Sequence, residues 1–339
     1  MIGGIAFAQD STKSNWTITG SVDGYYRYYF HNAKDSGITN NYTSFTNSQN
    51  SFELGMASLK VDHSMGKVAA TIDLGFGRRA EEFSYNDQGA RSAIKQAYLS
   101  YAPSSHVKLT MGKWNTHVGY ELPDAYLNRN YSMDYMFSYG PFFHTGLKAD
   151  FTFGNVGFMV GVTNPPDVLT ASFTKKFFIG QFSAASANGR VKGYLNYVGG
   201  KYESDITTNQ LDLVLNSLVS SKFSLGYNGT VQFVKPSVGD VDSWWGSAVY
   251  FNFDPTTMFG LTLRGEYYDD TKGVSGLTTA TGVPTGILDA TLSANIKIEN
   301  LTIIPEFRSD NAEDAIFFKN SGEAVKSTGS FILGATYHF

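Results

Sequence analysis

Sixteen segments of this chain alternate apolar and polar residues with a period of two, and the connections that join them are alternately long and short. A period of two predicts β-strands with one apolar face. Every odd-numbered segment is followed by a long polar connection, and every even-numbered one by a tight turn such as 62–66 or 102–105. An up-and-down barrel explains this alternation, whereas a sandwich or a propeller does not. The strands are expected near residues 16–30, 48–62, 66–77, 92–102, 105–113, 143–154, 155–164, 177–187, 189–201, 208–219, 222–234, 243–254, 257–269, 287–298, 301–309 and 329–339.

The composition places this barrel in a membrane. Aromatic residues make up 15% of the chain and charged residues 17%, yet the mean hydropathy is −0.19. No stretch approaches the roughly 20 apolar residues that a spanning helix needs. In a barrel each lipid-facing residue alternates with a lumen-facing one, which reconciles these values. The sequence therefore predicts an all-β, transmembrane, up-and-down antiparallel β-barrel of about 16 strands in the bacterial outer membrane. We expect short periplasmic turns, long external loops, both termini in the periplasm, and contact with the bilayer and lipopolysaccharide.

The two ends of the chain are expected to carry targeting signals. The last strand runs straight into a terminal aromatic carboxylate, which resembles the signal read by the outer-membrane barrel assembly machinery. Its apolar positions are Phe331, Leu333, Tyr337 and Phe339. At the other end, residues 6–8 read Ala-Phe-Ala and fit a small-x-small cleavage site. Residues 1–8 are expected to be the remnant of a signal peptide, and 9–339 a single barrel domain; an ordinary flexible N-terminus is the alternative.

One strand changes phase along its length. Phe52, Leu54 and Met56 share one phase, but Leu59 and Val61 have moved to the other. An extra residue in a strand shifts the phase of all the residues after it, so we expect a β-bulge near residues 57–58.

The longest connection, residues 114–143, is far longer than an ordinary loop and rich in Tyr, Phe and Met. In a barrel of this size such a loop can fold into the lumen and narrow it. The alternative is an external cap that packs on the rim. If the loop lies in the lumen, its charged residues are candidates for the narrowest part of the pore: Glu121, Asp124, Arg129 and Asp134.

The strand phase assigns further charges to the lumen. The basic candidates are Arg27, Lys108, Lys148, Lys192, Arg264, Lys297 and Arg308. The acidic candidates are Asp23, Asp73, Asp150, Asp212, Glu266, Asp289 and Glu306. The two sets are nearly equal, so the expected ion selectivity is weak. Pairing across neighbouring strands, as structural bridges in the wall, is the alternative role for each of them.

Charge and residue usage argue against several other functions. The net charge is −4 and basic runs are short, so nucleic acid is not an expected partner. The chain has no cysteine, which excludes disulfides and thiolate chemistry. Nothing near the six histidines marks a nucleophile or a metal site, and we expect no cofactor.

The long connection carries a family likeness. A strand ends in Gly112-Lys113-Trp114, the loop contains Asn130-Tyr131-Ser132, and the next strand opens with His144-Thr145-Gly146. This arrangement resembles that of the OmpL-like outer-membrane β-barrel porins, over about 35 residues. The resemblance implies a porin that lets small hydrophilic solutes or ions diffuse passively, and it supplies no catalytic residue. A structural or scaffold barrel plugged by its long loop is the main alternative, and a barrel enzyme is the second. Assembly as a homotrimer is suggested only by analogy with general porins.

Overall fold

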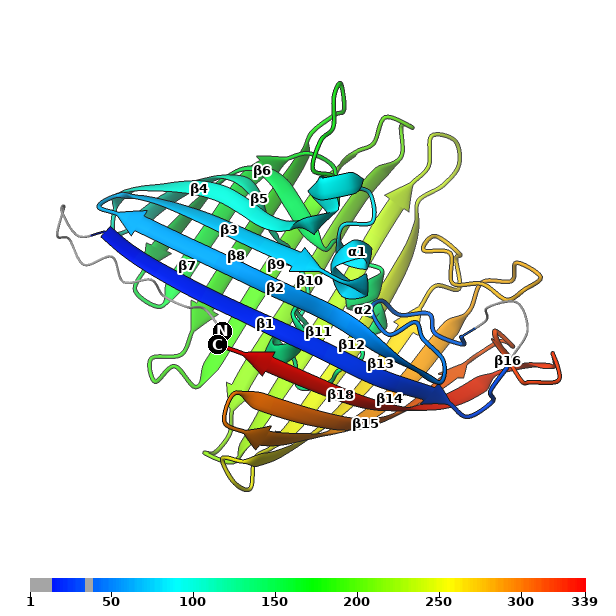
Figure 1. Cartoon of the computed structure of the whole chain (residues 1–339). Coiled ribbons are helices and arrows are strands. Elements are labelled where there is room, and N and C mark those ends of the chain that lie inside the picture. Colours follow the sequence, from blue (N-terminus) through cyan, green and yellow to red (C-terminus); the bar gives the residue numbers. More distant parts are fainter. Residues whose placement is uncertain (1–13, 34–38) are drawn as a thin grey trace.

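The computed structural model describes residues 14–33 and 39–339, so the expected signal remnant lies outside the described residues. Sixteen antiparallel strands close into one barrel, in which the first strand pairs with both the second and the last (Figure 1). The strands of the barrel are β1 (Ser14–Tyr29), β2 (Ser51–Met65), β3 (Val68–Phe76), β4 (Ile94–Ser104), β5 (Val107–Asn115), β6 (Phe143–Phe153), β7 (Val156–Thr163), β8 (Phe177–Ala185), β9 (Val191–Lys201), β10 (Thr207–Leu218), β11 (Phe223–Lys235), β12 (Asp242–Phe253), β13 (Phe259–Asp269), β14 (Gly286–Ile298), β15 (Leu301–Ala312) and β18 (Ser327–His338).

The predicted barrel is confirmed, with every predicted strand present and its bounds shifted by at most a few residues. Short elements inside the connections were not predicted. They are α1 (Arg78–Phe83), the 3-10 helices at Gly89–Ala93 and Ala125–Leu127, α2 (Tyr135–Ser138), and a small hairpin of β16 (Phe317–Phe318) and β17 (Ala324–Val325). None of the helices in the described chain is long and apolar enough to cross a bilayer.

Strand β14 shows why these residues form a barrel wall. Leu288 and Leu292 are 52% and 47% exposed on the outer surface, while Asp289, Thr291 and Ser293 between and beside them are fully buried inside. In a soluble sandwich the apolar face would be the buried one. The inverted arrangement, with apolar side chains outside and polar ones inside, is that of a barrel in lipid.

The predicted bulge in β2 is present at a different residue. Asp23 pairs with Met56 and the next residue, Gly24, pairs with Leu54, so Gly55 is the extra residue rather than residues 57–58. The prediction of its position is wrong because Met56 belongs to the inner face, where it is buried. A Cβ atom at position 55 would collide with the Asp23 carboxylate, so any larger residue in this bulge would have to displace that side chain.

A second bulge, in β4, places a lysine in the lumen. Asp73 pairs with Gln96 and Leu74 with Ile94, which leaves Lys95 between them without a partner in the ladder. Its side chain turns inward and is 1% exposed. The bulge thus adds an inward-pointing cation to the barrel wall.

The long connections and the short turns lie at opposite ends of the barrel. The seam between β1 and β18 ends at the short-turn end, where Phe339 and Gly20 exchange two backbone hydrogen bonds of 3.0 Å. The connection from β5 to β6 starts at the other end and folds into the barrel, so that α2 lies inside it (Figure 1). We call residues 116–142 of this connection the lumenal loop.

Candidate pore and its lumenal loop

The lumenal loop is held in the barrel mainly through its backbone. Glu306 of β15 accepts hydrogen bonds from the amides of Tyr131 and Ser132 at 2.7 and 3.0 Å. Glu266 of β13 accepts from the amides of Tyr135 and Met136 at 2.8 and 2.9 Å. These wall carboxylates satisfy loop amides that would otherwise be buried without partners, which is costly.

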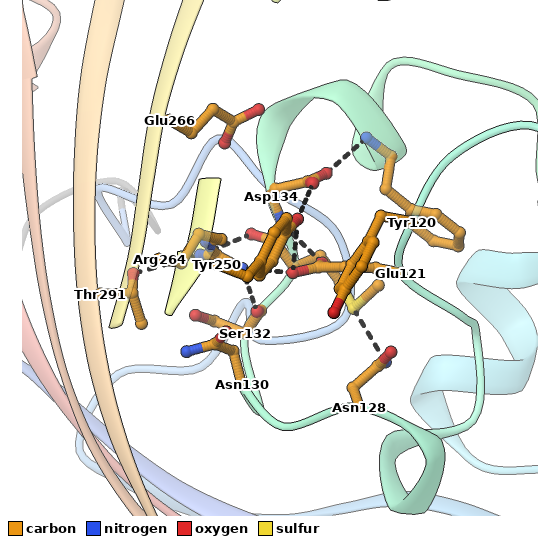
Figure 2. Close-up of polar contacts among 12 residues, drawn as sticks. Tyr120, Glu121, Asn128, Asn130, Ser132, Asp134, Tyr250, Arg264, Glu266 and Thr291 are labelled. Carbon is orange, nitrogen blue, oxygen red and sulfur yellow. Dashed lines mark hydrogen bonds and ion pairs between the residues drawn. The ribbon is translucent and has the colours of Figure 1, made fainter. Parts of the chain in front are cut away.

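Two arginines of the wall donate hydrogen bonds to backbone carbonyls of the same segment. Arg264 donates to the Ser132 carbonyl at 2.8 Å (Figure 2). Arg308 donates to the Met133 carbonyl at 2.7 Å. Arg264 also forms ion pairs with Glu121 of the loop at 2.6 Å and Asp289 of β14 at 2.9 Å. All the partners are nearly or fully buried. Loop and wall therefore share one network of buried charges, in which breaking a single pair is expensive.

Aromatic hydroxyls and rings complete this network. Tyr250 of β12 donates to Asp134 at 2.6 Å and stacks on Tyr120 with ring centroids 4.1 Å apart (Figure 2). The Asp134 side chain also accepts from the Phe137 amide and so caps α2. The loop is thus folded internally as well as attached to the wall.

A second group of charges anchors the loop on the far side of the barrel. Lys95, the bulged residue of β4, pairs with Asp124 of the loop at 2.5 Å and with Asp73 of β3 at 3.3 Å. Arg79 of α1 donates to the Pro123 and Tyr131 carbonyls at 3.2 and 3.3 Å. The loop therefore spans the lumen from β13–β15 to β3 and β4.

Glycines in the wall provide room for large loop side chains. A Cβ atom at Gly334 of β18 would lie 2.7 Å from Cγ of Tyr131, and one at Gly226 of β11 would lie 2.6 Å from the Tyr120 ring. Gly246 of β12 faces Met136 in the same way. Because these glycines line the inner face where the loop docks, the wall is shaped to receive it.

A crevice separates the loop from the wall at β10 and β11. It runs between residues 118–119, residues 136–141 and the polar side chains Gln210, Asp212 and Asn228, and it is too narrow to admit a water molecule. On this side the Gly119 and Tyr120 amides donate to Asp212 and Asn228 at 3.1 and 3.2 Å, and the Tyr120 ring packs against Gly226.

We call the part of the lumen between the loop and the short-turn end the vestibule. A recess of about 120 Å³ lies there against residues 126–129 of the loop. The recess is lined by Tyr126, Leu127, Asn128, Arg129, Asn295, Lys297, Thr302, Ile304 and Thr336.

The C-terminal end of the lumenal loop, where it joins β6, is held by Asp167, which lies in the connection between β7 and β8. Its carboxylate accepts hydrogen bonds from the Phe142 and Phe143 amides at 2.7 and 2.9 Å and from the Tyr85 hydroxyl at 3.3 Å. Burial raises the pKa of Asp167 from 3.8 to about 7, against the opposing effect of these hydrogen bonds and of Lys113. The carboxyl is thus protonated in part near neutral pH.

This shift predicts a pH dependence that Asp167→Asn should remove. The folded protein binds a proton that the unfolded chain releases between pH 4 and 7, so stability falls as pH rises across this interval, by up to about 1.4 kcal/mol per pH unit. The thermal unfolding midpoint of the wild type should decline more steeply there than that of the variant. Asp205→Asn is the control, because hydrogen bonds from Lys175 and Lys201 lower the pKa of Asp205 to about 2. Its titration therefore affects stability only below about pH 4, and between pH 4 and 7 its profile should run parallel to that of the wild type. Parallel profiles for the wild type and Asp167→Asn would contradict the assignment.

The predicted site residues divide into two groups by their surroundings. Most are buried in the contacts between wall and loop or beneath external connections: Asp23, Arg27, Asp73, Glu121, Asp124, Asp134, Asp212, Arg264, Glu266, Asp289, Glu306 and Arg308. The others remain partly exposed in the vestibule: Lys108, Arg129, Lys148, Asp150, Lys192 and Lys297. The terminal residues Phe331, Leu333, Tyr337 and Phe339 lie on the outer, lipid-side face.

Several charged residues of this arrangement were not among the sequence candidates. They include Arg79, Lys95, Lys113, Asp167, Asp254 and Asp310. Lys113 had a signal, since it stands in the Gly-Lys-Trp motif at the end of β5. No sequence pattern pointed to Lys95. A lumenal position is inferred from the alternation of inward and outward residues along a strand, and the bulge interrupts this alternation at Lys95. Among residues 14–33 and 39–339, no three His, Asp or Glu side chains converge to hold a metal ion.

Comparison with known proteins gives a consistent picture of the fold. The model of the family described as "Putative beta-barrel porin-2, OmpL-like" matches residues 15–339. Among solved structures, the outer membrane channel DcaP of Acinetobacter baumannii is similar with a TM-score of 0.65 at 12% identity, covering 98% of this chain and 99% of that one. An anion-selective porin from Comamonas acidovorans has a TM-score of 0.62 at 11% identity, over 96% and 100% of the two chains. The trimer form of OmpT from Vibrio cholerae has a TM-score of 0.62 at 12% identity, over 96% and 99%. Comparison with curated proteins gave no match.

Proposed function

This chain belongs to the beta-barrel porin-2, OmpL-like family, and we propose that it lets small hydrophilic solutes or ions diffuse passively across the outer membrane, under the control of its lumenal loop. The observation that carries this proposal is the closed sixteen-strand barrel, apolar outside and polar inside. Such a barrel is wide enough to hold an aqueous channel. Diffusion through it needs no cofactor and no energy source, and we propose no enzymatic activity.

The loop determines how wide that channel is. Its anchors on β13–β15 and on β4 are strong and buried, and the crevice at β10 and β11 excludes water. We therefore expect the barrel to conduct poorly while the loop is docked. Solutes should pass when part of the loop detaches from the wall.

A disulfide tether tests this role, and the natural chain has no cysteine to interfere. Because Cγ of Tyr131 lies 2.7 Å from a Cβ built on Gly334, the two Cβ atoms of Tyr131→Cys/Gly334→Cys fall within roughly 4 Å, as a disulfide requires. In planar bilayers we expect the oxidised double variant to show fewer or smaller openings than the wild type. Reduction should restore them, and each single variant serves as a control.

The same recordings separate the alternatives. Equal conductance in the oxidised and reduced states would mean that solutes pass around a docked loop, which then acts as a fixed constriction. A wild type that never opens would favour the second candidate function, a structural barrel plugged by its loop. The buried network around Arg264 is the observation that supports this second candidate, because it attaches the loop firmly to the wall.

The orientation and the partners follow from the same proposal. Outer-membrane barrels keep short turns in the periplasm and long loops outside, so we propose that the short-turn end, with both chain termini, faces the periplasm. We also propose contacts with lipopolysaccharide around the long loops and insertion by the barrel assembly machinery. Assembly as a homotrimer is proposed by analogy with OmpT of Vibrio cholerae, which has a trimer form. Protease accessibility in intact cells tests the orientation.

A further inference from the structure

The net charge of the side chains that line the water-filled part of the lumen differs from the net charge of all the residues that point into the barrel. In the wall and loop, the buried lumenal carboxylates are occupied: they accept loop amides, as Glu266 and Glu306 do, or they pair with arginine or lysine, as Glu121, Asp289 and Asp124 do. A carboxylate that is paired with a cation contributes little to the field at a distance, because the two charges cancel. The charges that face the vestibule lie closest to a solute in that space and act on it most directly.

The vestibule holds three ion pairs that cancel. They are Lys60 with Asp62 at 3.1 Å, Lys148 with Asp150 at 3.3 Å, and Arg129 with Asp254 at 2.7 Å. Each pair joins one cation to one carboxylate, and their side chains are 18–35% exposed. These six residues therefore contribute no net charge to the vestibule.

Three further lysines face the vestibule without a carboxylate partner. Lys108 of β5, Lys192 of β9 and Lys297 of β14 lie near the short-turn ends of their strands, in phase with the buried inner residues Thr110, Asn196 and Asn295. Across the described residues, none of these lysines has a carboxylate oxygen within 4 Å. The lumen-facing side chains of the vestibule thus carry an excess of positive charge.

The surroundings of Lys297 are built to receive an anion. Lys297 lies beside Thr302, and Thr302 beside Thr336, in one row across β14, β15 and β18. This row lines the recess of about 120 Å³. The lining contains two cations, Lys297 and Arg129, of which Arg129 pairs with Asp254, and no carboxylate. Hydroxyl donors around a cation suit the oxygens of a carboxylate or a phosphate.

We infer that this porin prefers small anions, and that Lys108, Lys192 and Lys297 set the preference from the vestibule. The inference rests on the proposed function. Charge of one sign in a low-dielectric mouth raises the local concentration of counter-ions. The effect is screened over about 10 Å at 0.1 M salt, so the preference should weaken as the ionic strength rises. The solutes concerned are inorganic anions and small organic acids.

The reversal potential in a KCl gradient across a planar bilayer tests the inference. The wild type should pass chloride in preference to potassium, by several-fold up to about tenfold at low salt. The triple variant Lys108→Gln/Lys192→Gln/Lys297→Gln should lose most of this preference. The triple variant Lys176→Gln/Lys235→Gln/Lys272→Gln is the matched control, because it removes the same charge from exposed lysines at the long-loop end of the barrel.

Each outcome separates the inference from the function on which it rests. A conducting wild type that prefers potassium, or one whose preference the lumenal triple variant leaves unchanged, would overturn the inference while the porin function stands. An equal loss in the control variant would assign the selectivity to net charge and overturn the role of the three lysines. A wild type without any channel activity would overturn both.

Discussion

Replacing Arg264 with alanine is expected to lower the free energy of unfolding by about 3–5 kcal/mol, since it leaves buried carboxylates without their partner. Arg264 is fully buried and contacts Glu121, Asp289 and the Ser132 carbonyl. Its loss removes the contact that links the loop to both β13 and β14. We therefore also expect the loop to detach more easily and the mean conductance to rise. The temperature at which the folded band is lost on unheated gels, with bilayer recordings beside it, measures both effects.

Arg129→Ala is the matched control for this variant. Arg129 also joins the loop to the wall, but its pair with Asp254 is about one third exposed, and such a pair contributes about 0–1 kcal/mol. Adding Glu121→Gln and Asp289→Asn to Arg264→Ala should recover part of the lost stability, because the uncompensated charges disappear. If Arg264→Ala and Arg129→Ala were equally stable, the buried network would not be what anchors the loop.

Replacing Phe339 with aspartate is expected to remove most of the assembled protein from the outer membrane and to leave the conductance of any remaining channels unchanged. The Phe339 backbone pairs with Gly20, and its ring packs over the same glycine, where a Cβ atom would meet it at 2.6 Å. The residue thus lies at the seam where β18 meets β1. An unsealed seam leaves two strand edges without partners in a medium that cannot hydrogen-bond to them.

Phe153→Asp separates the loss of the seam from the cost of a polar residue in lipid. Phe153 is 55% exposed near the short-turn end of β6, and Phe339 is 58% exposed. An acidic residue near the membrane interface costs about 0–1 kcal/mol, so Phe153→Asp should assemble almost normally. Equal losses of heat-modifiable barrel in the two variants would deny the terminal residue a special part in assembly.

The strands could be predicted because each has one face in lipid and one in the lumen. Leu288 and Asp289 already show opposite preferences as neighbours in the sequence, and the pattern needs no knowledge of distant contacts. The bulges escaped this reasoning. The change of phase in β2 was visible, but its position at Gly55 depends on the Asp23 carboxylate on the neighbouring strand, which periodicity does not reveal.

The candidate site was less predictable than the fold for a related reason. Phase places Arg264 and Lys297 on the inner face equally well, and a count of such residues gives nearly balanced charges. The two residues differ in exposure because the loop covers Arg264 and leaves Lys297 facing water. Coverage by a loop more than a hundred residues away is a property of the folded chain, so selectivity could not be read from a list of charges.

The lumenal loop also fixes an order of events during folding. It follows β5 in the chain, yet Glu306, which holds the Tyr131 amide, lies 175 residues further on. The loop cannot dock until β13 to β15 are in place, because its principal partners do not yet exist as a surface. Docking is then a late event that follows insertion of the last strands. The contacts of the loop with Lys95 of β4 and Arg79 of α1 can form earlier, because both residues precede the loop in the chain. Completion of the chain's final third therefore decides whether the loop is held across the lumen or only at one side of it.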